Sequence, residues 1–181
     1  MTDEQLRGLY RSQDVIEGLL YPDMPSVKPS KQSLFARLFG RERSRKVGGL
    51  PTEDQMDLDK AWHVLHFLFT GSAWEGEFPQ GFLVSCGKPV GDVDVGYGPA
   101  RGYTPAEVAQ ISAYLESLDL SALRTSLGPK RLSEEGIYPD FGSEEPISDE
   151  DWEYCSGAFN NMAAFVSETA RRQMALLVYI N

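Results

Sequence analysis

The sequence predicts an α+β fold, a single domain in which about four to six helices pack against a small mixed or antiparallel sheet. Two helix signals and the placement of the strand-like segments support this prediction. A capping box opens a helix at Thr104, and an apolar stripe runs along residues 148–171. Short apolar segments typical of strands lie between helices without regular alternation, which argues against a doubly wound α/β sheet.

The N-terminal part is expected to contain one or two short helices over about 2–21. Thr2 and Gln5 have capping-box spacing, Ser12 can cap a second turn, and the Tyr21-Pro22 step ends the helical region. A further short helix is expected over 31–40. We expect residues 1–181 to form one domain, with a basic loop or appendage at about 28–49.

Residues 57–71 have the apolar spacing of a helix, with Asp57 as its expected N-cap and Gly71 as its expected end. The apolar positions that recur at helical spacing are Leu58, Ala61, Trp62, Leu65 and Phe69. The helix that opens at Thr104 is expected to reach about residue 118, because Pro105 and Glu107 complete its start signal.

The remaining segments complete the predicted order of elements. A shorter helix is expected around 119–127, an extended segment at 137–139, and a last helix from Ser148 to about 171. Residues 82–86 are predicted to form a strand, and a second short strand is expected after a turn at 87–89. Residues 174–180 are predicted to form a buried strand that closes the fold.

The composition restricts the class of function and the cellular location. The 27 acidic and 17 basic residues give a net charge of −10, which favours a soluble protein and argues against generic binding of nucleic acid. The two cysteines, Cys86 and Cys155, are too few for a disulfide framework and indicate a reducing compartment. Without a signal peptide or an apolar run long enough to span a bilayer, the expected location is the cytoplasm. No membrane partner is expected.

The predicted 57–71 helix carries a polar strip beside its apolar face. Asp59, His63, His66 and Thr70 fall together on a helical wheel. His63 and His66 are the only two histidines in the chain. Arg101 follows a rigid Gly-Pro-Ala loop and could face the histidines. The complete candidate pocket consists of Asp59, His63, His66, Thr70, Tyr97, Arg101 and Tyr138.

Three interpretations of this strip remain open on the sequence alone. In the first, Asp59 bonds to His63 and His66 satisfies buried backbone, so that the strip is structural. In the second, a histidine performs acid–base chemistry while Arg101 holds an anionic ligand. The third is a metal site, but zinc needs more ligands than two histidines, so no metal is predicted. No nucleotide-binding or other cofactor motif is present, and no cofactor is predicted.

Two segments concentrate charge of opposite sign. Residues 28–46 contain seven basic residues and one acid, whereas residues 134–153 contain nine acids and no base. Such runs are usually solvated surface, although a basic segment with apolar residues could also contact a partner groove.

Four passages of the sequence resemble the YfbM-like family of bacterial proteins of unknown function. The resemblance runs from about residue 50 to residue 181, and its passages are 58–71, 96–101 with the Thr104-Pro105 helix start, 137–139 and 176–180. It implies a compact α+β domain and a bacterial source, and it implies no activity. It also implies a short strand before the first helix, which this sequence lacks.

The sequence therefore leaves the function unknown. The leading hypothesis is a non-catalytic intracellular binding or interaction domain. The alternative is a small-molecule enzyme for an anionic substrate, with His63 or His66 as acid–base group and Arg101 as anion clamp. The partner is expected to be an unknown protein or a small anionic ligand, and the oligomeric state is undetermined.

Overall fold

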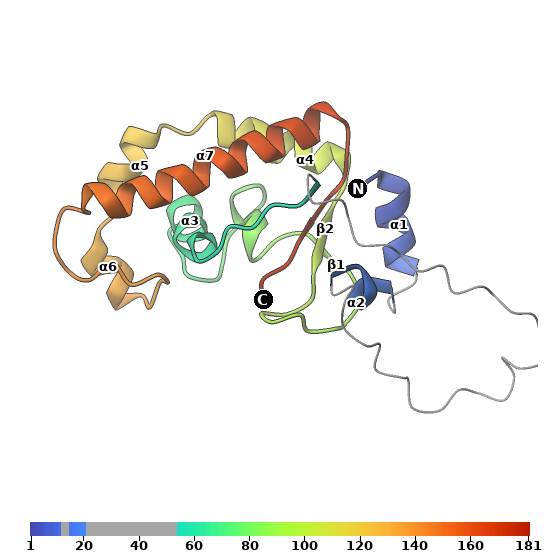
Figure 1. The fold of residues 1–181 in the computed structure, drawn as a ribbon, viewed down its shortest axis with the longest axis horizontal. Helices are drawn as coiled ribbons and strands as arrows, with labels where there is room; N and C mark the ends of the chain where they lie inside the picture. The colour runs from blue at the N-terminus through green and yellow to red at the C-terminus, as the bar shows by residue number, and fades with distance from the viewer. Residues whose placement is uncertain (12–14, 21–53) are drawn as a thin grey trace, which may run out of the picture.

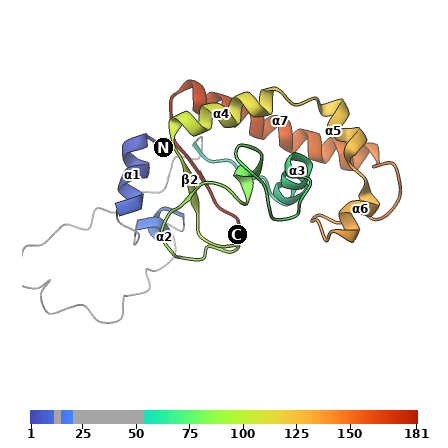
Figure 2. The same ribbon diagram turned by 180° about the vertical axis from the view of Figure 1, so that it is seen from behind.

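The computed structural model describes residues 1–11, 15–20 and 54–181, and these ranges form a helical layer beside a small sheet. Figure 1 shows the long helix α7 lying beside α4, with α3 below it, while α1 and α2 lie near the sheet. Figure 2 shows the same neighbours from behind. In chain order, the elements are α1 (Asp3–Arg11), α2 (Val15–Leu20), α3 (Ala61–Thr70), η3 (Gln80–Leu83), β1 (Lys88–Pro89), β2 (Arg101–Tyr103), α4 (Pro105–Glu116), α5 (Leu120–Ser126), α6 (Pro129–Glu134), α7 (Asp149–Arg171) and β3 (Leu176–Val178).

The three strands form one antiparallel sheet in the order β1-β2-β3. Lys88 pairs with Gly102, and Arg101 pairs with Val178. The predicted α+β class is confirmed, and the closing strand is present as β3, although it is shorter than the predicted 174–180 segment. The expected turn at 87–89 is wrong in its position, because Lys88 and Pro89 themselves form β1, and the strand β2 was not predicted. The sheet is small because each strand contributes only two or three residues.

The predicted strand at 82–86 is wrong, because Phe82 and Leu83 belong to a 3-10 helix, η3, and residues 84–85 continue from it as a turn. The Gly81 carbonyl accepts hydrogen bonds from the backbone N–H groups of Val84, Ser85 and Cys86, which winds the chain tightly. A Cβ at position 81 would lie 2.7 Å from the Gly76 carbonyl oxygen, so this turn needs glycine. The apolar run is buried as predicted, but a run of this length does not distinguish a strand from a buried turn of helix.

Capping residues start α1, α4 and α7 where the sequence places them. Thr104 and Glu107 form a complete capping box at α4, and the Ser148 hydroxyl accepts from the Asp151 N–H at α7. The Thr2 hydroxyl accepts from Gln5 N–H at 3.1 Å, and the Gln5 side chain accepts from Thr2 N–H at 2.7 Å. The expected Ser12 cap, the helix over 31–40 and the basic segment over 28–49 lie outside the described residues.

Helix α3 begins later than predicted. Its N-cap is Lys60, and Asp57 instead accepts a hydrogen bond from the Asp59 N–H at 2.8 Å. Asp59 has a positive φ of 47°, so it stands outside the helix and off the α3 wheel. Gly71 ends the helix in the left-handed conformation, as expected.

The N-terminus, where the family resemblance implies a short strand before the first helix, lies beside the start of β3. The Met1 amino group donates to the Ala175 carbonyl at 3.3 Å, and the Ala175 N–H donates to the Met1 carbonyl at 2.9 Å. Leu6 of α1 packs directly over Gly102, where a Cβ would lie within 2.5 Å of it. The first helix therefore covers the sheet without a strand of its own.

The main core lies between α3, α4, α7 and the sheet. Buried side chains from α3 and α7, including Leu65, Phe69, Phe159 and Met162, meet Val108 and Ile111 of α4 there. Cys155 of α7 is buried in a neighbouring cluster with Val64 and Phe67. None of the helices in the described part of the chain has the length and hydropathy needed to cross a membrane.

Candidate functional site

His63 of α3 connects two loops through its imidazole ring. Its Nδ1 accepts a hydrogen bond from the Tyr138 N–H at 3.2 Å, and its Nε2 lies 3.0 Å from the Ala73 carbonyl oxygen. Because Nδ1 accepts, the proton of the neutral ring is on Nε2, which donates to Ala73. The side chain is only 3% exposed, and this burial lowers its pKa. His63 is therefore a neutral connector in the folded protein.

His66 lies one turn further along α3 and has no such connection. The residue is fully buried, and neither ring nitrogen has a hydrogen-bond partner among the described residues. Burial lowers its pKa to about 4, and the neighbouring His63 adds to the decrease. The Glu75 backbone lies near enough to oppose this decrease, although it does not reach hydrogen-bonding geometry. A buried polar ring without a partner is an unfavourable arrangement.

The other predicted members of the helix strip have separate surroundings. The expected hydrogen bond from Asp59 to His63 is not formed, because Asp59 lies outside the helix and its carboxylate accepts from the Tyr154 hydroxyl at 3.4 Å. The Thr70 hydroxyl donates to the His66 and Ser72 carbonyls. Both interactions of Thr70 are local to the end of α3.

Arg101 lies on β2 and does not meet the histidines. Its guanidinium donates to the Ser85 carbonyl at 3.3 Å. Within the described ranges, no hydrogen bond or ring contact joins Arg101 to His63 or His66. The geometry therefore does not bring an anion clamp to the two imidazole rings.

The structure assembles an aromatic surface around His63 instead. The rings of Trp62 and Trp74 each lie 4.7 Å from the His63 ring, centroid to centroid, and 6.0 Å from each other. Tyr97 packs against both tryptophans, at 5.5 Å from Trp62 and 6.0 Å from Trp74. Trp74 is 49% exposed and Tyr97 is 59% exposed. We call Trp62, Trp74 and Tyr97 the aromatic patch.

The loops that carry the aromatic patch are fixed by backbone hydrogen bonds. Asp94 accepts from the N–H groups of Gly96 and Gly98, at 2.8 and 2.9 Å. The Tyr97 N–H donates to the Ile180 carbonyl at 3.1 Å, next to the closing strand. Gly96 adopts a φ of 140°, and a Cβ there would lie 2.5 Å from the Ile180 oxygen, so only glycine fits this approach. Tyr97 is therefore held in place against Trp62.

Exposed carboxylates accompany the aromatic patch. Glu75 follows Trp74 in the chain, Asp94 closes the turn that carries Tyr97, and Asp57 lines the same pocket as Trp62. The two backbone N–H groups that Asp94 accepts lower its pKa, which keeps it ionised. One cation also lies in this region: the Lys60 ammonium is 5.5 Å from the centre of the Tyr138 ring.

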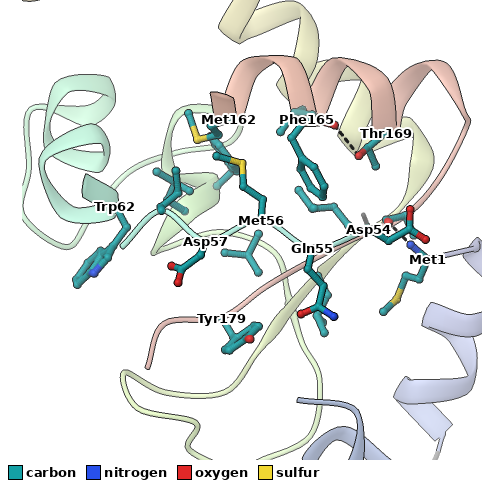
Figure 3. A pocket seen from close by; sticks show the side chains of 18 of the residues that line it. Met1, Asp54, Gln55, Met56, Asp57, Trp62, Met162, Phe165, Thr169 and Tyr179 are labelled. Atoms are coloured by element: carbon teal, nitrogen blue, oxygen red, sulfur yellow. Dashed lines mark hydrogen bonds between the residues drawn. The ribbon is translucent and has the colours of Figure 1, made fainter. Parts of the chain in front are cut away.

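A pocket of about 510 Å³ adjoins the aromatic patch at Trp62. Figure 3 shows residues 54–57 crossing it as an extended segment, with Phe165 and Met162 of α7 above and Tyr179 below. Trp74 and this pocket were not found from the sequence, because Trp74 lies in an irregular loop and the pocket joins segments far apart in the chain. In the described ranges, no three His, Cys, Asp or Glu side chains gather as metal ligands would.

The fold and this site together define a small α+β domain with an exposed aromatic surface beside a pocket. Comparison with known proteins then identifies its family. A family model described as a domain of unknown function (DUF1877) matches residues 1–179, and the chain belongs to this family.

The protein YfbM from Escherichia coli, whose crystal structure is described as that of a protein of unknown function, has the same fold. The match has a TM-score of 0.63 and 22% identity, and it covers 98% of this chain and 93% of YfbM. The predicted resemblance to the YfbM-like family is confirmed. No curated protein matches the sequence.

Proposed function

We propose that this protein is a non-catalytic binding domain that uses the aromatic patch to hold an arginine-containing segment of a partner protein. The observation that carries this proposal is the exposure of Trp74 and Tyr97 in one contiguous ring cluster. Large exposed aromatic clusters mark interaction sites, and Trp and Tyr are enriched among the residues that dominate binding energy.

The rigidity of the patch supports a binding role. His63 ties the Trp74 loop to α3 through Ala73, and Asp94 fixes the Tyr97 turn. A surface that is ordered before association loses less conformational entropy when a partner binds. The aromatic rings are thus presented in a fixed arrangement.

The charge of the surroundings favours a cationic partner. Asp57, Glu75 and Asp94 are exposed close to the patch in the chain or in space, and the whole chain has a net charge of −10. An arginine guanidinium stacks on tryptophan and tyrosine faces and pairs with carboxylates. The surface is suited to arginine, in contrast to the small anionic ligand that the sequence also suggested.

The geometry gives the enzyme alternative less support. Both nitrogens of His63 are engaged with backbone groups, and His66 is fully buried. An acid–base residue needs a nitrogen within reach of its substrate. The proposed set of Asp59, His63, His66 and Arg101 would have to rearrange before it could act on one ligand.

We further propose a bacterial cytoplasmic location. Two observations support it: Cys86 and Cys155 are both free thiols, and the similar structure comes from Escherichia coli. Unpaired cysteines are typical of reducing compartments.

A peptide titration tests the proposed surface. We expect a tetra-arginine peptide to bind and to change tryptophan fluorescence, whereas a tetra-glutamate peptide should not bind. The Trp74→Ala/Tyr97→Ala variant should bind the arginine peptide at least about tenfold more weakly. Tyr154→Ala removes an exposed aromatic residue on α7 and is the matched control. Equal affinity of the two variants for the arginine peptide would contradict the proposal.

A further inference from the structure

The pocket beside Trp62 has the size of a small-molecule site. It encloses about 510 Å³ between the 54–59 segment, α7 and the end of the chain around β3. Ligand pockets typically span roughly 300–1,000 Å³. In Figure 3 the labelled side chains of Met56 and Phe165 point into the space between the extended segment and α7.

The middle of the pocket is apolar. It is lined by Met56, Leu58, Phe165, Val166 and Val178. Val166 belongs to the main core cluster, and the other four pack against that cluster. Met56 and Phe165 are partly buried, so their apolar surface faces the pocket as well as the core. These walls suit a hydrocarbon chain, since they offer dispersion contacts to any apolar body that enters.

The acidic side chains at one end of the pocket form ion pairs, whereas, among the described residues, those at the other end do not. At one end, Asp54 forms an ion pair with Arg172 at 2.8 Å, and Glu168 pairs with Arg171. Toward the other end lie Asp57 and Asp59. Neither of these two carboxylates forms an ion pair within the described ranges.

The end with the unpaired carboxylates also has aromatic walls. Trp62 and Tyr179 line the pocket there, and Figure 3 shows Asp57 between Trp62 and Met56 in the view. The Asp57 carboxylate accepts a hydrogen bond from the Asp59 N–H, and the Asp59 carboxylate accepts one from the Tyr154 hydroxyl. Both donors are uncharged, so neither neutralises the carboxylate it contacts. Aromatic faces together with carboxylates form the chemistry that recognises ammonium groups.

We infer that this pocket binds a cationic amphiphile, a small molecule with one ammonium head and an apolar chain. The head lies between Trp62, Asp57 and Asp59, and the chain runs along Met56 and Phe165. This site extends away from the peptide surface of the proposed function, although the two share Trp62 and Asp57. Neither proposal depends on the other.

The first test compares three ligands that differ only in the head group. Octyltrimethylammonium, nonanoate (an octyl chain with a carboxylate) and octanol are titrated into the protein, well below the micellar concentration. Binding is measured by calorimetry and by Trp62 fluorescence in a Trp74→Phe/Trp152→Phe background. We expect the ammonium compound to bind at least about tenfold more tightly than octanol, and nonanoate to bind most weakly. Equal affinities, tighter binding of nonanoate, or no binding of the ammonium compound would overturn the inference.

Two variants then separate head and chain recognition. Asp57→Asn/Asp59→Asn should lose at least about tenfold in affinity for octyltrimethylammonium and leave octanol binding unchanged. Thr169→Phe adds bulk to the α7 wall of the pocket and should weaken both ligands. If both Asp57→Asn/Asp59→Asn and Thr169→Phe bound octyltrimethylammonium as tightly as the wild type, the assignment of this pocket as the ammonium site would be overturned. Glu75→Gln changes a carboxylate beside the peptide surface that does not line the pocket, so it should not alter ammonium binding. Circular dichroism verifies that each variant is folded.

Discussion

At the scale of residues, the two histidines of α3 have opposite environments although they are separated by a single helical turn. His63 uses both ring nitrogens to hold backbone groups of two loops, whereas His66 uses neither. The first ring therefore stabilises the loops around the aromatic patch. The second is buried without hydrogen bonds, which is unfavourable at every pH and more so when the ring is protonated.

The lowered pKa of His66 predicts a loss of stability in acid. Its pKa is about 4 in the folded protein and 6.5 in the unfolded chain, so the unfolded chain binds the proton first as the pH falls. His66 therefore leaves the stability independent of pH above about pH 6.5 and lowers it as the pH falls to about 4, by roughly 3 kcal/mol in total. In His66→Leu this contribution should disappear, and the stability at pH 7 should stay within about 1 kcal/mol of the wild type.

Urea denaturation at several pH values between 4 and 7 measures both effects. His63→Ala is the comparison variant, because it leaves the Ala73 carbonyl and the Tyr138 N–H without their partner. We expect it to destabilise the protein by about 2–4 kcal/mol at pH 7 and by less in acid, because the lowered pKa of His63 makes the wild type lose stability there as well. A steep acid dependence that persists in His66→Leu would show that other groups cause it.

At the scale of elements, short polar signals decide where helices begin. The capping residues Thr104 and Ser148 are local, and the sequence indicates both. The start of α3 differs, since Asp57 bonds the Asp59 N–H and the helix begins only at Ala61. A potential cap residue can therefore stabilise a turn before the helix in place of the helix itself.

The capping box of α4 should contribute measurably to stability. Thr104→Ala removes the hydroxyl that accepts from Glu107 N–H, and we expect a loss of about 1 kcal/mol in the free energy of unfolding. Thermal and urea unfolding measure this change. Thr125→Ala, inside α5 and equally exposed, is the control and should change stability by less than about 0.5 kcal/mol. Equal effects of the two substitutions would argue that the cap is not formed.

At the scale of the whole molecule, the excess of acidic residues dominates the surface. The net charge is −10, and the ion pairs among the described residues lie largely on the surface, where each contributes little. Repulsion among the remaining carboxylates opposes the compact state. The negative potential of the same carboxylates attracts cationic partners. Both proposed binding sites are consistent with this field.

Screening of this repulsion should stabilise the protein. We expect the melting temperature at pH 7 to rise by a few degrees when NaCl is increased from about 0.02 M to about 0.5 M, because the Debye length falls well below the spacing of surface charges. Calorimetry at both salt concentrations measures the change. Near the isoelectric point of about 4.7 the net charge vanishes, so the same increase in salt should have little effect there. A lower melting temperature in high salt at pH 7 would contradict this account.

The sequence by itself determined the α+β class, the capped helices, the left-handed end of α3 at Gly71 and the family, because these depend on local spacing and residue type. Only the tertiary structure decided the path of 80–86 and the surroundings of the candidate residues. An apolar run such as Phe82-Leu83-Val84 is buried in either conformation, and long-range contacts with Tyr103 select the turn. Similarly, the aromatic patch brings Trp62 of α3 together with Trp74 and Tyr97 from two loops. No local sequence pattern predicts that these loops approach the helix.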